Sequence, residues 1–249
     1  MSSNFFSIKM ENFNLSSIEE TYLKFKEEES TPIDLNNYLV SIETRKNMIN
    51  WLIFLCNTLN FTNQTLFRTI SIYDQYLSKI SQKELEDMTQ NKLNLITIGC
   101  LSLSTKLEEV NCNYISFLNE KVLNTPNEKI FTNKDLTKME LAILKTLKYK
   151  TIYSTPLDFI DIYLEIFTNF PGNNKSFMTP QMISFIKDAS INILKDNVIN
   201  INYLTNNASH FAYLCFIQAL NQVSMMNSFC FNQFKKTVFI FTYQFANIF

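Results

Sequence analysis

The stretch Leu93-Asn-Leu-Ile-Thr-Ile-Gly-Cys-Leu-Ser-Leu-Ser-Thr-Lys-Leu107 decides how this sequence folds. It is apolar on nearly every side of a helix, and the small residues Gly99, Ser102 and Ser104 are interleaved with the large ones. A helix that is apolar all round has to be surrounded by other elements. We therefore predict that residues 93–107 form the central helix of a helical bundle.

The segments on either side carry apolar residues three or four positions apart, which is the spacing of one face of a helix. Two such segments, 45–59 and 62–79, precede the central helix, and two more, 113–123 and 133–147, follow it. Together they predict a five-helix first bundle. A further short helix is expected at 17–29, ahead of this bundle.

The second half begins with Thr155-Pro-Leu-Asp158, where Thr can cap a helix, Pro occupies the first helical position and an acid lies in the first turn. Thr179-Pro180 repeats this signal. Helices are expected at about 156–168, 180–198, 207–224 and 229–248, and they predict a second bundle of similar plan. The chain ends at the fourth of them, so a fifth helix is either absent or belongs to a longer parent protein.

Composition favours an all-α protein. The 249 residues are 46% apolar and 18% charged, with a formal net charge of -1, so the chain is expected to fold around a packed core. Only 2 Gly and 5 Pro occur, too few for the turns of large sheets or for Gly-rich phosphate loops. The near-neutral charge argues against nucleic acid as a partner. The apolar tail 237–249 is shorter than the roughly 20 residues that span a membrane.

The residues that carry chemistry are sparse. The one histidine, His210, has no cysteine at metal-ligand spacing, so we expect no metal and no cofactor. The five cysteines are expected to be buried free thiols, and no signal peptide is visible, which favours the cytoplasm, the nucleus or both. No catalytic motif is present, so we expect a protein that recognises a partner rather than an enzyme. The cysteines stand at positions 56, 100, 112, 215 and 230.

Five motifs in a fixed order go further than fold class, and the segment Thr155-Pro-Leu-Asp-Phe159 follows them. The motifs are Arg45-Lys-Asn-Met-Ile-Asn-Trp51-Leu52, Ile72-Tyr-Asp74-Gln-Tyr-Leu-Ser78, Leu103-Ser-Thr-Lys106-Leu-Glu-Glu109, Lys138-Met-Glu140 and Leu144-Lys-Thr-Leu-Lys-Tyr149. With these motifs in this order, the chain resembles the cyclins, most clearly over residues 16–165, and segment 18–25 looks like the helix that precedes the box in the cell-cycle branch. The resemblance implies a cyclin-like fold with an N-terminal extension (1–40), an N-terminal cyclin box (41–152) and a C-terminal cyclin-like bundle (153–249).

The resemblance implies that the chain binds and activates the catalytic subunit of a cyclin-dependent Ser/Thr protein kinase in cell-cycle control. In the family, the residues that match Lys106 and Glu140 contact the mobile regulatory helix of the kinase and the adjacent loop. The alternative for these two residues is an ordinary solvated helix pair. The apolar residues expected to support the kinase-binding face are Leu103, Leu107, Leu144 and Tyr149.

Arg45 and Asp74 match a pair that ties the first helix of the box to the second. Arginine is scarce here, since only two of the 22 basic residues are arginines, and its planar guanidinium is not reproduced by lysine. This scarcity gives some support to a structural ion pair.

The substrate-docking groove of the family is only partly present. Its matching positions are Met48, Trp51, Leu93 and Asn94, while Thr44, Asn47 and Phe54 depart from the usual residues. We therefore expect docking of substrate peptides to be altered or lost. Two other readings remain open, a cyclin-fold scaffold and a transcription-associated cyclin that does not activate a cell-cycle kinase.

Overall fold

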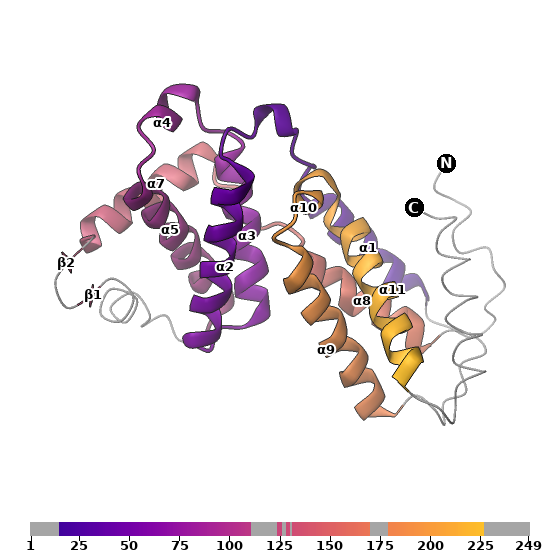
Figure 1. The fold of residues 1–249 in the computed structure, drawn as a ribbon. Helices are drawn as coiled ribbons and strands as arrows, with labels where there is room; N and C mark the ends of the chain where they lie inside the picture. The colour runs from indigo at the N-terminus through magenta and orange to yellow at the C-terminus, as the bar shows by residue number, and fades with distance from the viewer. Residues whose placement is uncertain (1–14, 111–123, 126–127, 130, 170–178, 227–249) are drawn as a thin grey trace. The chain divides into compact units, whose positions relative to one another are not determined.

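A computed structural model describes residues 15–110, 124–125, 128–129, 131–169 and 179–226 (Figure 1). Within these ranges the chain is helical, apart from an antiparallel pair of two-residue strands, β1 (Asn124–Thr125) and β2 (Glu128–Lys129). The prediction of an all-α fold is therefore confirmed. The helices predicted at 113–123 and 229–248 lie outside the described residues.

The chain divides into two compact units, which we describe separately. The N-terminal unit comprises Ser30–Thr155 together with Val198–Asn207, and the C-terminal unit comprises Met1–Glu29, Pro156–Asn197 and Ala208–Phe249. This division differs from the boundaries 1–40, 41–152 and 153–249. The first helix joins the C-terminal unit because its aromatic residues pack there, and Val198–Asn207 joins the N-terminal unit because Arg45 binds the carbonyl of Val198.

Helix α5 (Gln90–Glu108) is the centre of the N-terminal unit. It packs against α2 (Ile42–Thr58), α3 (Asn63–Leu77) and α7 (Asn133–Thr146), as Figure 1 shows. Its residues are buried almost without a break from Ile96 to Thr105. The predicted central helix is thus confirmed, and its apolar circumference is explained by three neighbouring helices.

Gly99 lets α7 lie close to α5. A Cβ atom at this position would lie 3.0 Å from the Ile143 Cδ1 atom and 3.0 Å from the Met139 Cγ atom, both of which belong to α7. Such separations are shorter than normal carbon–carbon contacts. The small residue in the central helix therefore sets the spacing of the two helices that carry Lys106 and Glu140.

Polar residues cap the helices of the N-terminal unit. The side chains of Ser41, Thr62 and Thr132 each accept a hydrogen bond from a backbone N–H in the first turn of α2, α3 and α7. Helix α2 consequently begins three residues earlier than predicted. The described residues of this unit also include three short helical segments that the pattern did not predict. They are a 3₁₀ helix (Leu35–Asn37), α4 (Gln82–Glu86) and α10 (Asn202–Thr205).

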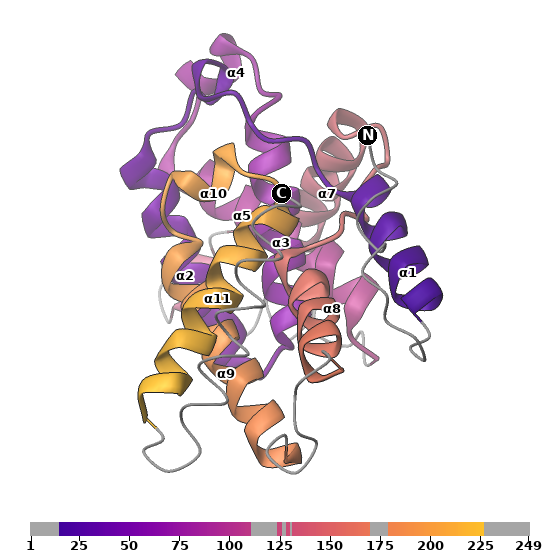
Figure 2. The same ribbon diagram turned by 90° about the vertical axis from the view of Figure 1, so that its right-hand side faces the viewer.

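The described residues of the C-terminal unit form α1 (Leu15–Glu28), α8 (Pro156–Thr168), α9 (Pro180–Asn197) and α11 (Ala208–Met226). Helix α11 packs against α8 and α9, and α1 lies beside α8 (Figure 2). Tyr22 and Phe25 of α1 meet the Phe159 ring edge-on, with centroids 5.8 and 6.1 Å apart. These aromatic contacts hold the first helix against the second half of the chain.

The described cysteines Cys56, Cys100 and Cys215 are buried free thiols, while positions 112 and 230 lie outside the described residues. Burial raises the pKa of Cys215 to about 12, so its thiol stays protonated. No group of three or more His, Cys, Asp or Glu side chains in the described ranges is placed to hold a metal ion. The helices described are also too short or too polar to cross a lipid bilayer.

Candidate functional site

Lys106 and Glu140 form an ion pair between α5 and α7. The Lys106 Nζ atom lies 2.6 Å from the Glu140 Oε1 atom, and the Ser102 hydroxyl donates to the same oxygen at 2.6 Å. The Glu140 side chain is 11% exposed and that of Lys106 is 38% exposed. The carboxylate is therefore held within the helix packing, while the ammonium group reaches the surface.

The spacing of residues in α5 explains why three groups converge here. Ser102 and Lys106 are four positions apart, so they lie on the same face of the helix and both reach Glu140. Ser102 is one of the small residues interleaved in the central helix, and its buried hydroxyl donates to the carboxylate. The small residues that let α5 occupy the centre of the unit therefore also allow the ion pair with α7. Among the described residues, Lys106–Glu140 is the only ion pair between these two helices.

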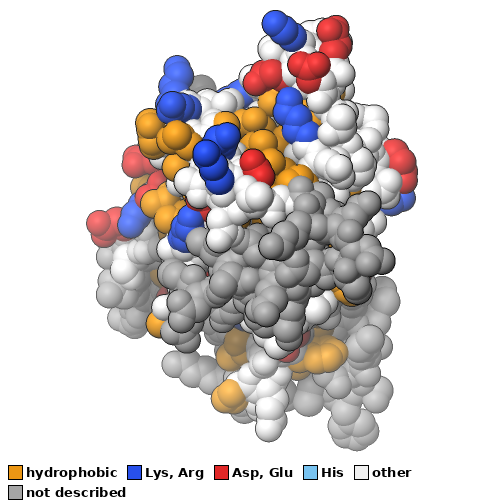
Figure 3. All heavy atoms as spheres, turned by 90° about the vertical axis from the view of Figure 1, so that its left-hand side faces the viewer, with side chains coloured by type: hydrophobic (Ala, Val, Ile, Leu, Met, Phe, Trp, Pro, Cys, Tyr) orange, Lys and Arg blue, Asp and Glu red, His pale blue; other side chains and the backbone are white. Residues whose placement is uncertain are grey.

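Two of the four apolar residues predicted beside this pair are exposed. Leu107 is 46% exposed and Tyr149 is 66% exposed, whereas Leu144 is half-buried and Leu103 is buried in the helix packing. From the side on which α5 and α7 lie in Figure 1, apolar side chains are seen beside basic and acidic ones (Figure 3).

Sequence reasoning missed two further exposed apolar residues, Leu141 and Ile152. Leu141 follows Glu140 directly on α7, and Ile152 follows the end of that helix. Leu141 directly follows the motif 138–140, and Ile152 lies shortly after the motif 144–149, so their positions in the sequence could have indicated them. We call the exposed residues Lys106, Leu107, Leu141, Tyr149 and Ile152 the exposed ridge.

The backbone places Tyr149 outside the helix end. Lys148 and Tyr149 have φ angles of 52° and 63°, in the left-handed region that non-glycine residues seldom adopt. The Tyr149 N–H donates to the Leu144 carbonyl at 2.7 Å, which closes the last turn of α7. This reversal ends the helix and directs the following residues away from its axis.

Arg45 and Asp74 form a buried, two-pronged ion pair. Arg45 Nε and Nη2 each donate to one Asp74 oxygen at 2.8 Å, and Arg45 is 1% exposed. Arg45 Nη1 also donates to the Val198 carbonyl at 3.0 Å, and the Tyr38 hydroxyl donates to Asp74 Oδ1 at 3.1 Å. Burial and the neighbouring Asp74 carboxylate raise the pKa of Tyr38, so its hydroxyl stays a donor.

Arg68, the second arginine, was not singled out from the sequence. It lies on α3, is 8% exposed, and its Nε donates to Glu108 Oε1 at 2.6 Å. Its Nη1 donates to the Tyr153 carbonyl, also at 2.6 Å. The scarcity of arginine in the chain was the signal that could have found it.

The four residues that match the docking groove serve mainly in packing. Met48 and Leu93 are buried, and Trp51 and Asn94 are half-buried. The Gln90 side chain donates to Asn94 Oδ1 at 2.9 Å and contacts the Met48 sulfur at 3.8 Å. Two of the four positions, Met48 and Asn94, are therefore contacted by Gln90 within the chain.

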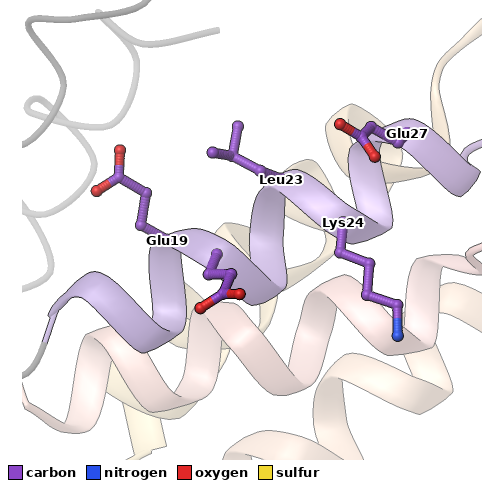
Figure 4. Close-up of a pocket in the computed structure, with 5 residues that line it drawn as sticks. Glu19, Leu23, Lys24 and Glu27 are labelled. Carbon is purple, nitrogen blue, oxygen red and sulfur yellow. The ribbon is translucent and has the colours of Figure 1, made fainter.

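A shallow hollow runs along the exposed side of α1 (Figure 4). It is lined by Glu19, Glu20, Leu23, Lys24 and Glu27, all from one helix. The described residues do not enclose a small molecule there, because walls from a second element are missing.

Comparison with known proteins places the chain in a family. Residues 14–152 match the family described as "Cyclin, N-terminal domain". This match covers more than half of the chain, and the chain belongs to the cyclin family. The predicted family membership is thereby confirmed.

Known relatives are similar over part of their length. The chain is 29% identical over 153 residues to Cyclin-D2-2 of Oryza sativa subsp. japonica, a match covering 61% of this chain and 40% of that protein. It is 30% identical over 133 residues to Cyclin-B2-1 of Arabidopsis thaliana, covering 53% and 27%. The chain thus spans well under half the length of these two relatives.

A solved structure supports the fold independently. The chain superposes on a viral cyclin from herpesvirus saimiri with a TM-score of 0.65, covering 93% of this chain and 97% of that one. Sequence identity between the two is 17%, so this likeness concerns the fold alone. It confirms the predicted cyclin-like fold.

Proposed function

We propose that this chain binds and activates a cyclin-dependent Ser/Thr protein kinase and acts in cell-cycle control. The observation that carries the proposal is the Lys106–Glu140 pair at 2.6 Å, together with two exposed apolar residues, Leu107 directly after Lys106 and Tyr149 just beyond the end of α7. Membership of a regulatory family and the similarity to B-type and D-type cyclins support it.

The physical role of such a surface is to select one state of the kinase. Phosphoryl transfer by protein kinases requires a Lys–Glu ion pair and an activation segment that are both in register. A rigid surface that binds only the in-register state shifts the kinase population toward it. Driving that equilibrium from 1:99 to 99:1 requires roughly 10⁴-fold tighter binding of the favoured state.

The exposed ridge has the two kinds of groups that this task needs. Its apolar members supply affinity, because burying apolar surface contributes about 25 cal/mol per Å². Its one charged member, Lys106, supplies orientation more than affinity, because its ammonium group and the partner's charge both lose solvation on binding. Lys106 is the member best placed for the second role, since its ammonium group already reaches the surface.

The test is a charge exchange, Lys106→Glu combined with Glu140→Lys. The two side chains lie 2.6 Å apart, so the exchanged pair can form again, and the Ser102 hydroxyl can accept from a lysine as readily as it donates to a glutamate. We expect helicity and melting temperature to stay near wild type. Co-purification with candidate kinases and histone phosphorylation should both be lost, because the charge presented to the partner is reversed.

The matched control is the same exchange at an exposed ion pair of the C-terminal unit. Lys187 Nζ lies 2.6 Å from Asp161 Oδ1, and both side chains are well exposed. Lys187→Glu with Asp161→Lys should bind and activate as the wild type does. A Lys106/Glu140 exchange variant that also activates normally would remove these two residues from the proposed interface.

The scaffold reading has one observation in its favour. Glu140 is already bonded to Lys106 and Ser102 in the free chain, so the pair needs no partner to be satisfied. Under this reading, the folded wild-type chain captures no cyclin-dependent kinase. The same co-purification therefore separates the two functions.

We also propose that docking of basic-x-leucine substrate peptides is lost. Met48 and Leu93 are buried, and Gln90 bonds the half-buried Asn94, so little apolar groove is left for a leucine side chain. Calorimetric titration with such a peptide should give no binding up to high micromolar concentration. Binding at low micromolar concentration would show that the groove is functional.

A further inference from the structure

Both arginines of the chain bridge a carboxylate and a backbone carbonyl from a buried position. Arg45 does so with Asp74 and Val198, and Arg68 does so with Glu108 and Tyr153. The twenty other basic residues are lysines. Arginine is suited to this role because its planar guanidinium donates in several fixed directions at once, whereas lysine acts as a point charge.

The two acceptors of Arg68 are the sequence neighbours of two members of the exposed ridge, Leu107 and Ile152. Glu108 is the last residue of α5, next to Leu107 and two positions after Lys106. Tyr153 directly follows Ile152, in the segment after α7. One guanidinium from α3 is thus bonded at 2.6 Å to the end of α5 and at 2.6 Å to the segment after α7.

A second carboxylate fastens the end of α5 to α3. Glu109 Oε1 accepts from the Thr62 N–H at 2.9 Å and from the Thr65 hydroxyl at 2.5 Å, at the first turn of α3. The end of α5 therefore has two attachments to α3, through Glu108 and through Glu109. The Glu109 contacts join only α5 and α3, whereas Arg68 also donates to the carbonyl of Tyr153 in the segment after α7.

We propose that Arg68 is a positioning residue for kinase binding, which holds the α5 end and the segment after α7 in one arrangement. This inference rests on the proposed function. Arg68 is 8% exposed, so it acts through Leu107 and Ile152 rather than by touching the partner. Without its guanidinium, a carboxylate and a carbonyl lose their donor, and the two segments are free to move separately.

The test compares matched substitutions at the two arginines. Arg68→Lys keeps the positive charge but cannot hold both acceptors in the same geometry, and Arg45→Lys makes the same chemical change at a pair that shares no acceptor with the exposed ridge. Affinity for a kinase that the wild type binds is measured for each folded variant. We expect Arg68→Lys to weaken binding by roughly two- to thirtyfold, the range typical of coupling residues. Arg45→Lys should leave the affinity of the folded chain unchanged.

Hydrogen exchange in the free chain gives a readout that does not depend on a kinase. The Glu109 N–H donates to the Thr105 carbonyl at 3.0 Å and reports on the α5 end, and the amides of residues 150–154 report on the segment after α7. We expect Arg68→Lys to speed exchange in both places and to leave α2 unchanged. Glu108→Gln is the second variant, because it loses the charge while keeping the shape, and it should act in the same direction.

The outcomes separate this inference from the proposed function. Unchanged affinity in Arg68→Lys and Glu108→Gln, with wild-type binding intact, overturns the positioning role alone. Exchange that rises uniformly over the N-terminal unit also overturns it, since that result indicates general destabilisation. If the wild type binds no kinase, the proposed function fails, and the exchange data still decide whether Arg68 couples the two segments.

Discussion

At the scale of single residues, the stability of the N-terminal unit depends on a few buried charges. Asp74 is buried and is bonded by Arg45 through both of its oxygens. Arg45→Ala removes the cation and leaves the carboxylate buried with the Tyr38 hydroxyl as a donor but without a compensating positive charge. We expect a loss of about 3–5 kcal/mol, the usual consequence of breaking a buried pair from one side. Urea unfolding followed by circular dichroism measures it, and a midpoint equal to that of the wild type would show that the pair contributes nothing.

Two buried serines differ in whether their hydroxyl groups form a hydrogen bond. The Ser102 hydroxyl donates to Glu140, whereas the Ser154 hydroxyl has no hydrogen-bond partner in the described part of the chain. Ser102→Ala should therefore destabilise the protein by about 1–3 kcal/mol, because a buried carboxylate loses a donor. Ser154→Ala should be neutral or slightly stabilising, since it removes a polar atom that is desolvated without compensation.

Thermal and urea unfolding of the two serine variants decide the question. Each substitution removes one oxygen atom from a buried site, so any difference between them comes from the hydrogen bond rather than from packing. Equal losses in both variants would contradict the role assigned to Ser102.

The motifs brought together Arg45 with Asp74 and Lys106 with Glu140, and the structure places each pair within 2.8 Å. The acceptors of Arg68 could not be identified from the sequence in the same way. Its carboxylate partner is 40 positions away and its other acceptor is a backbone carbonyl, which every residue has. A contact of that kind exists only once the fold has brought α3, α5 and the segment after α7 together.

At the scale of helices, the start of α3 depends on a carboxylate from α5. Glu109 accepts from Thr65 and Thr62, and although its partial burial raises its pKa, these hydrogen bonds lower it below the ordinary value of 4.5. A depressed pKa means that the carboxylate stabilises the fold above pH 4.5. This contribution is lost as the pH falls through the lower value in the folded state.

Glu109→Gln should accordingly change the pH dependence of stability. At neutral pH we expect the variant to be less stable than the wild type by less than about 1 kcal/mol, because partly exposed interactions are weakened by solvent. Below pH 4.5 the difference should shrink, since the wild-type carboxylate becomes protonated there. Melting temperatures from pH 3 to pH 7 test this expectation, and a constant gap at every pH would contradict it.

Long periodic helices could be predicted from the sequence, and short ones could not. The predictions for α8 and α9 agree with the structure to within one residue, because Pro marks the first position of each. α4 and α10 have five and four residues, too few to show a repeating apolar face. α4 nevertheless carries a capping box, formed by Ser81 and Glu84, which was the available signal.

At the scale of the whole molecule, the sequence predicted two bundles but not which segments complete them. Val198–Asn207 belongs to the N-terminal unit although it follows α9 in the chain. The Ile33 N–H donates to the Leu204 carbonyl at 2.7 Å, and the Tyr203 ring centroid lies 5.5 Å from the guanidinium carbon of Arg45. These contacts involve a backbone carbonyl and the face of an aromatic ring, so no residue pattern indicates them.

A fragment of residues 30–155 should therefore be less stable than the N-terminal unit within the whole chain. Cutting after Thr155 removes the Val198 carbonyl that accepts from Arg45 and the Leu204 carbonyl that accepts from Ile33. Water can replace these acceptors once the segment is gone, so each lost hydrogen bond lowers stability by about 0.5–1.5 kcal/mol. A second fragment, in which a flexible linker joins residues 198–207 to the end of the first, should recover stability because tethering gives a high effective concentration. Urea unfolding distinguishes the two, and equal midpoints would mean that Val198–Asn207 does not support the unit.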